Sequence, residues 1–201
     1  MGRLDYPTQP IPNTFSGVPT FRHALVRRTK RLDNEIFDID YEGRHYCLKT
    51  VHSKEGGSGL KREITILQHC RHPHIISFQG IVINDRNGVE GILTELIPDT
   101  ITLDEFDFSR FSKEQCDLWI SQYRSAVKYL HSNCLVWGDA KPANILIRPP
   151  DNDLVLVDFA GGASEKWVDW KKMNTQDGDM QALDRIEKFL QHRVTHSESN
   201  N

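Results

Sequence analysis

Apolar and polar positions alternate along the first half of the chain. Within residues 35–41 every second residue from position 37 is apolar, which predicts a strand with one buried face. Together with a tight turn at 42–43, residues 21–52 are predicted to form a three-stranded meander. Residues 75–83 and 89–96 are predicted to add two more strands. The first half of the chain therefore predicts an antiparallel sheet.

Helical spacing of apolar residues appears in three segments. The first predicted helix spans 59–70. The second begins with a capping box, in which Ser112 accepts the N–H of Gln115, and runs to about Ser132. The third spans 178–192. The expected buried faces carry Leu60, Ile64 and Leu67; Cys116, Trp119, Ile120, Tyr123, Val127 and Leu130; and Met180, Leu183, Ile186 and Leu190.

The segments between these elements are predicted to be irregular. Residues 1–20 hold four prolines and predict an irregular arm that packs along the domain or is disordered, with binding to a partner as the alternative. Residues 53–59 are glycine-rich and predict a flexible loop, residues 102–106 a short helical turn, residues 163–176 an irregular segment, and residues 196–201 a polar, frayed tail.

The chemistry of the chain concentrates in the stretch Leu135–Ile147. Two apolar runs with strand character flank a polar loop that carries Asp139, Lys141 and Asn144. A second apolar run then ends at Asp158. Carboxylate and amide oxygens at the edges of two strands suit Mg²⁺, which binds oxygen ligands and substrate phosphates. The stretch predicts a phosphoryl-transfer site in which Asp139 orients or deprotonates an acceptor hydroxyl.

A second pair of charged residues lies further upstream. Glu63 falls on the apolar face of the first predicted helix, where an unpaired carboxylate is costly. Lys49, on the last strand of the meander, is the expected partner.

Composition narrows the class of protein. The chain has 201 residues, which suits one domain or two small lobes, and a net charge of −3, which argues against a nucleic-acid partner. The four cysteines form no C-x-x-C pair and predict free thiols. No apolar run reaches the roughly 18 residues of a membrane span, and the N-terminus carries no secretion signal. We expect a monomer, without a membrane partner, in the cytoplasm or the nucleus.

The order of these features resembles the protein-kinase fold over residues 20–192. Asp139 and Asn144 have the D-x-x-x-x-N spacing of that family, with Lys141 between them, and Asp158-Phe159 follows. The resemblance implies a bilobal α+β fold with an antiparallel N-lobe sheet plus one helix and a minimal, mainly helical C-lobe. The expected divisions are an arm (1–20), the N-lobe (21–98), a shortened C-lobe (99–195) and a tail (196–201).

The resemblance also implies ATP and Mg²⁺ as cofactors. Lys49 would neutralise the α- and β-phosphates, with Glu63 holding Lys49 in place. Asp139 would be the catalytic base, and Asn144 and Asp158 would bind Mg²⁺.

Further roles are implied for four residues. Lys141 resembles the lysine that steadies the transferring phosphoryl group in Ser/Thr-type kinases. Thr94 falls at the gatekeeper position, and Glu95 and Ile97 fall at the hinge, where backbone groups bind adenine.

The chain departs from the family pattern at four places. No glycine-rich motif joins the first two strands, where the turn reads 30–34. Trp137-Gly138 replaces His-Arg before the catalytic Asp. Ala160 replaces the glycine of D-F-G, a position where a positive φ suits alanine poorly. No A-P-E motif follows, although Asp179 matches the acid that opens a central C-lobe helix. In this shortening the chain is similar to compact kinase-like proteins of fungi.

Three functions fit these features. The leading interpretation is an ATP·Mg²⁺-dependent phosphotransferase of the protein Ser/Thr kinase type, which requires a protein substrate. The lost glycine motif favours a pseudokinase, a nucleotide-binding or regulatory module. The Gly138-Asp139 pair also occurs in small-molecule kinases, which leaves the class of acceptor open.

Overall fold

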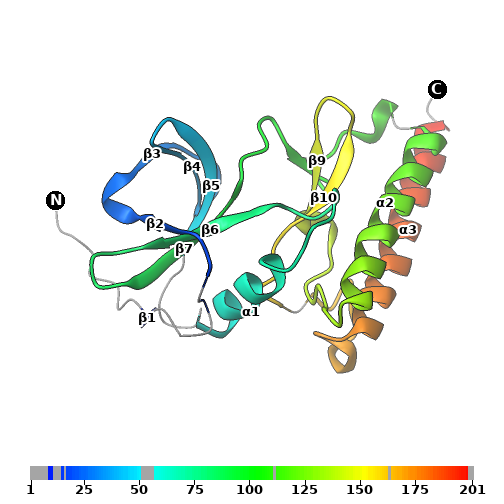
Figure 1. The fold of residues 1–201 in the computed structure, drawn as a ribbon. Helices are drawn as coiled ribbons and strands as arrows, with labels where there is room; N and C mark the ends of the chain where they lie inside the picture. The colour runs from blue at the N-terminus through cyan, green and yellow to red at the C-terminus, as the bar shows by residue number, and fades with distance from the viewer. Residues whose placement is uncertain are drawn as a thin grey trace. The chain divides into compact units, whose positions relative to one another are not determined.

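The computed structural model describes residues 9–10, 15, 17–50, 57–110, 112–162 and 164–198. The chain divides into two compact units, one formed by Met1–His69 with Ser77–Ile97 and the other by Cys70–Ile76 with Pro98–Asn201 (Figure 1). Each unit is described separately below. Among the described residues, no helix combines the length and apolarity needed to cross a membrane.

The first unit is built on a curled sheet in the order β2-β6-β7-β5-β4-β3, with β1 paired to β7 (Figure 1). The predicted meander and the second hairpin are both present, and their pairings are antiparallel. The parallel pairing of β2 with β6 was not predicted. The strands are β1 (Gln9–Pro10), β2 (Thr20–Arg22), β3 (Val26–Arg31), β4 (Ile36–Tyr41), β5 (Arg44–Thr50), β6 (Phe78–Ile83) and β7 (Gly88–Glu95).

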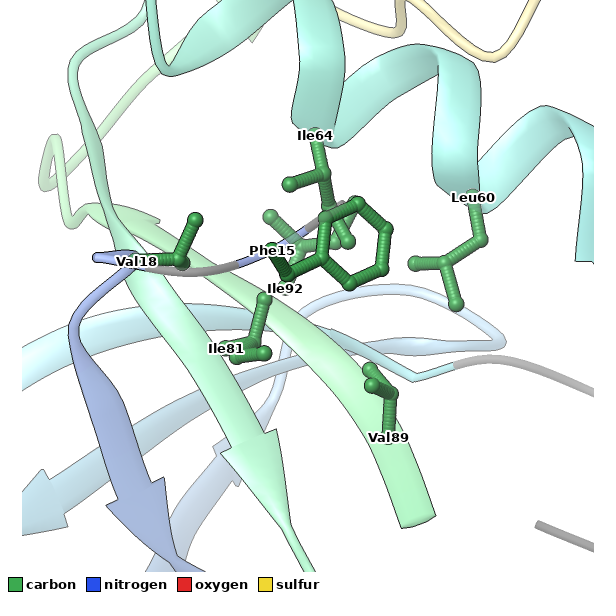
Figure 2. Packing of buried hydrophobic residues seen from close by; sticks show 7 residues of the cluster. All are labelled: Phe15, Val18, Leu60, Ile64, Ile81, Val89 and Ile92. Atoms are coloured by element: carbon green, nitrogen blue, oxygen red, sulfur yellow. The ribbon is translucent and has the colours of Figure 1, made fainter. Parts of the chain in front are cut away.

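Helix α1 (Gly57–Leu67) covers one face of this sheet. It begins two residues before the predicted start at 59 and ends three before 70, so part of the expected loop is helical, whereas residues 51–56 lie outside the described residues. Leu60 and Ile64 pack against side chains of β6 and β7, as Figure 2 shows, in a cluster that contains Phe15, Val18, Leu60, Ile64, Ile81, Val89 and Ile92. Burying each such side chain contributes about 1.5–3 kcal/mol.

The N-terminal arm contributes to this cluster. Phe15 and Val18 are buried in it, and Gln9–Pro10 forms β1. Phe15 and Val18 therefore pack in this cluster, and Gln9–Pro10 is a short strand where irregular structure was expected, while 1–8, 11–14 and 16 lie outside the described part.

The second unit holds two long helices, α2 (Lys113–Ser132) and α3 (Gln176–Glu198), which lie side by side (Figure 1). The Ser112 cap is present, since its side chain accepts the Gln115 N–H at 3.2 Å. A small antiparallel sheet, in the order β10-β9-β8, completes the unit. Its strands are β8 (Ile101–Thr102), β9 (Ile145–Arg148) and β10 (Asp153–Leu156).

Four predictions for this unit were wrong. Leu135–Trp137 forms no strand. A helical turn was expected at 102–106, but residues 101–102 pair with β9 and the turn that follows them is not helical. Helix α3 starts at Gln176 and extends to Glu198. Met180 is 45% exposed, because the buried stripe of α3 starts at Asp179 and passes through Ala182 instead.

Candidate active site

The first unit pairs a lysine with a buried glutamate. Lys49 lies on β5, and its Nζ donates to Glu63 Oε2 of α1 at 3.0 Å. The Glu63 side chain is 6% exposed and that of Lys49 is 31% exposed. The predicted pairing is therefore present, and it satisfies a carboxylate that would otherwise be buried without a countercharge.

The end of β7 carries the residues expected at the gatekeeper and hinge. Thr94 lies opposite Cys47 of β5, and burial raises the pKa of the Cys47 thiol although a hydrogen bond with Thr94 opposes the shift. Glu95 is fixed by Ser77, which accepts its N–H at 2.9 Å and donates to its carboxylate at 3.0 Å. Ile97 follows as a half-buried residue. The backbone at Glu95, at the end of β7, is thus fixed to Ser77.

The β3–β4 turn stands where the family has its glycine-rich motif. Backbone N–H groups of this turn donate hydrogen bonds within the turn itself. The N–H groups of Leu32 and Asp33 both donate to the Ile36 carbonyl, and Asn34 N–H donates to the Asp33 carboxylate. The Arg31 guanidinium donates to the carbonyls of Asp33 and Asn34. These amides are therefore engaged within the turn, whereas a glycine-rich loop presents such groups to phosphates.

In the second unit, Asp139 is the centre of a buried polar cluster. Lys141 Nζ donates to Asp139 Oδ2 at 2.6 Å, and Asn144 Nδ2 donates to the same oxygen at 3.0 Å and to the Asp139 carbonyl at 2.9 Å. Within the described part of the chain, Oδ1 is buried and accepts no hydrogen bond. One carboxylate oxygen is thus fixed by two donors, and the other keeps its full capacity to accept.

Gly162 packs directly against this carboxylate. A methyl group added at Gly162 would lie 2.8 Å from Asp139 Cγ and 3.0 Å from both carboxylate oxygens. Only a glycine fits here without moving Asp139. This contact of Gly162 was not predicted from the sequence.

Asp158 follows β10 closely and adopts a left-handed backbone, with φ of 59°. Gly161 is the other residue of this segment with positive φ, at 82°. The expected difficulty at Ala160 does not arise, because the positive φ values fall on an aspartate, which tolerates them better than most residues, and on a glycine. The neighbouring Phe159 is completely buried.

The Asp139 loop is anchored by Asp179 of α3. Asp179 is 1% exposed and accepts the N–H groups of Trp137 at 2.8 Å and of Gly138 at 2.9 Å, and His131 Nε2 at 3.0 Å. Gly138 has φ of 88°, which favours glycine. The predicted match of Asp179 to a helix-opening acid thus corresponds to a structural anchor for the loop.

Trp137 links this loop to the segment after β10 that contains Asp158. Its indole Nε1 donates to the carbonyls of Val157 at 2.9 Å and Asp158 at 3.2 Å, and the side chain is fully buried. The sequence identified Trp137-Gly138 only as a departure from the family pattern, and the structural role of the indole was not predicted. The role of the indole could have been predicted from a Trp directly before the polar loop, since an indole N–H that is buried needs an acceptor.

Comparison with known proteins identifies the class to which this arrangement belongs. Residues 39–181 match the family described as protein kinase domain. The chain therefore belongs to the protein kinase domain family, which confirms the resemblance and the α+β fold class.

Three relatives illustrate the similarity. A calcium/calmodulin-dependent protein kinase of Metarhizium anisopliae is 37% identical over 48% of this chain and 26% of its own length. The probable serine/threonine-protein kinase fhkC of Dictyostelium discoideum is 29% identical over 69% of this chain and 24% of its own. The meiosis-specific serine/threonine-protein kinase MEK1 of Saccharomyces cerevisiae is 29% identical over 84% of this chain and 34% of its own. The chain thus spans about a quarter to a third of these relatives' length.

Proposed function

We propose that this chain is an ATP- and Mg²⁺-dependent protein kinase that phosphorylates Ser or Thr hydroxyls. The geometry of Asp139 carries the proposal. Leaving a buried acceptor without a donor costs about 1–3 kcal/mol, and Oδ1 is such an acceptor. An acceptor hydroxyl would supply the missing donor and would lose its proton to Asp139 as the phosphoryl group transfers.

The neighbours of Asp139 suit this role. Lys141 and Asn144 fix the second oxygen, so the carboxylate is already oriented before the substrate arrives. Lys141 would also steady the negative charge of the transferring group. Because Gly162 covers the carboxylate, the acceptor gains access when the backbone at 161–162 moves aside, and the two glycines permit that motion.

The donor set after the loop fits Mg²⁺. The Asn144 amide directs its nitrogen to Asp139, which leaves its oxygen as the metal-facing atom, and Asp158 adds a carboxylate. Hard oxygen ligands of this kind suit Mg²⁺. When bound, the ion would neutralise charge on the nucleotide phosphates.

In the first unit, Lys49 would contact the α- and β-phosphates. Glu63 restricts the lysine to one position, so less conformational entropy is lost on nucleotide binding. Backbone groups of Glu95 and Ile97 would bind adenine, with Thr94 limiting the depth of that site.

The test is transfer of γ-phosphate from ATP·Mg²⁺ to a generic protein substrate and to the chain itself. We expect Asp139→Asn and Lys49→Ala each to abolish transfer. The matched controls are Asp117→Asn and Lys128→Ala, which make the same two substitutions at exposed residues of α2. Both controls should retain phosphoryl transfer. Transfer that survives in Asp139→Asn would refute the role of the base.

A nucleotide-binding or regulatory module without catalysis is the second candidate. It is favoured by the β3–β4 turn, whose engaged amides cannot also bind phosphates. The same experiment separates the two functions. Absence of transfer, combined with a rise in unfolding temperature on adding ATP·Mg²⁺, would indicate the binding module.

A further inference from the structure

A cavity of about 230 Å³ lies in the second unit beside the candidate base. Its walls include Lys141, Lys166, Arg193, Trp167, Phe189 and Asp104. Lys141 is also the residue that donates to Asp139. A group bound in the cavity would therefore lie one side chain away from the carboxylate proposed to receive the acceptor proton.

The charge of this cavity is predominantly positive. Three cations face one carboxylate, Asp104, which is itself exposed to solvent. Lys141 is neutralised by Asp139. Lys166 and Arg193 form no ion pair with the carboxylates that the structure describes. The cavity thus offers two uncompensated positive charges to a ligand.

Aromatic rings hold these two cations in place. Lys166 Nζ lies 5.1 Å from the centre of the Trp167 ring. Arg193 Cζ lies 5.3 Å from the centre of Phe108 and 5.1 Å from that of Phe189. A cation–π contact restricts the position of a charge without neutralising it. The rings also pack edge to face, with Phe189 5.8 Å from both Trp167 and Phe108.

The segment that supplies Lys166 is tied to α3. Arg185 Nη2 donates to Asp169 Oδ1 at 2.6 Å, and its Nη1 donates to the Lys166 carbonyl at 3.4 Å. Gln181 accepts the Asp169 N–H at 2.8 Å and donates to its carboxylate at 2.7 Å. These contacts lower the pKa of Asp169, so the tether is charged at neutral pH. These contacts fix the cavity wall to α3.

We propose that this cavity binds an acidic side chain of the acceptor polypeptide, close in sequence to the hydroxyl that is phosphorylated. The inference rests on the proposed kinase function and names its substrate class. The volume is below the roughly 300–1,000 Å³ of pockets for small-molecule ligands, which suits a single side chain. A guanidinium and an ammonium fixed on aromatic rings form charge-assisted hydrogen bonds with a carboxylate.

The experiment compares three serine peptides that differ only in the flanking residues, which are Glu, Ala or Lys. We expect kcat/KM for the Glu peptide to exceed that for the Lys peptide by about tenfold or more, the value of one well-placed charge-assisted contact. In the unaltered chain this ratio should fall as salt is raised, because the cations are partly exposed. Equal rates, or a preference for the Lys peptide, would overturn the proposal.

Charge reversal identifies the cavity as the source of the preference. Lys166→Glu combined with Arg193→Glu should reverse the preference, while Lys128→Glu combined with Lys188→Glu, an equal change of charge at exposed helix positions, should keep it. Because Arg193 packs on two rings, Lys166→Ala alone provides a milder variant and should reduce the ratio.

Binding of the same peptides, labelled and followed by fluorescence anisotropy, separates this proposal from the proposed function. If no peptide is phosphorylated, the kinase function fails. Selective binding of the Glu peptide that is lost in the Lys166→Glu, Arg193→Glu variant would then still support the cavity. Binding without selectivity would overturn it, whatever the activity.

Discussion

Asp179 is predicted to stabilise the second unit more than any other polar residue described above. It accepts two backbone N–H groups, from Trp137 and Gly138, in a site where it is only 1% exposed. Asp179→Ala leaves both donors buried without an acceptor, at about 1–3 kcal/mol each, so the expected loss is about 2–6 kcal/mol. A domain is commonly stable by only about 5–15 kcal/mol. The variant should therefore be close to unfolding.

Asp179→Asn is the graded variant. Its amide keeps one acceptor oxygen but turns an NH₂ group toward a donor, so we expect a loss of about 1–3 kcal/mol. The control is Asp177→Asn in the same helix turn, where the residue is exposed and the effect should stay below about 1 kcal/mol. Both changes remove one negative charge near the start of α3.

The assay is urea unfolding followed by tryptophan fluorescence, to which the buried Trp137 contributes. With a slope of about 1–3 kcal/mol per molar urea, Asp179→Ala should lower the midpoint by about 1 M or more. Phosphoryl transfer should also fall in Asp179→Asn, because the loop that carries Asp139 loses an anchor. A loss below about 1 kcal/mol for Asp179→Ala would show that other groups satisfy the two amides and would refute this reasoning.

Three further predictions follow from single contacts. Gly162→Ala should displace the Asp139 carboxylate and lower kcat by about 10- to 100-fold while leaving urea unfolding nearly unchanged. At pH 8 iodoacetamide should modify the exposed Cys134 well before Cys70, whose pKa burial raises to about 11, with mass spectrometry as the readout. Tyr123→Phe should change the free energy of unfolding by less than about 1 kcal/mol or stabilise the chain, because the hydroxyl is buried and, among the described residues, finds no partner.

Each of these predictions has a contradicting result. Unchanged kcat in Gly162→Ala would show that the carboxylate adapts freely. Equal labelling of the two thiols at pH 8 would show that Cys70 is accessible. Burial raises the pKa of the Cys70 thiol from its ordinary value of 9.0 to about 11, so the folded state favours the protonated thiol. The stability that this contributes is present below about pH 9 and is lost as the pH rises to about 11. A clear destabilisation in Tyr123→Phe would reveal an acceptor for its hydroxyl.

Local patterns in the sequence determined much of the fold. The period-two alternation in 36–41 is β4, and the Ser112 capping box opens α2 at the predicted residue. Glu63 lies on the apolar face of α1, where a carboxylate needs a partner, and the predicted partner, Lys49, is the one observed. These features were predictable because periodicity, capping and the cost of a buried charge depend on a few neighbouring residues.

The tertiary structure decided how the candidate active site is held together. Asp179 accepts hydrogen bonds from Gly138 and Trp137, which precede it by 41 and 42 positions in the chain. The Trp137 indole donates to the backbone of Val157, which follows it by 20 positions. The contact of Gly162 with Asp139 is similarly remote from any local pattern. An acid at the start of a helix, a buried indole and a glycine each have many structural uses, and the choice among them depends on which distant groups the packed fold brings within hydrogen-bonding distance. The sequence alone indicated which residues are candidates for phosphoryl transfer, and the tertiary contacts determined which groups fix the loop around Asp139.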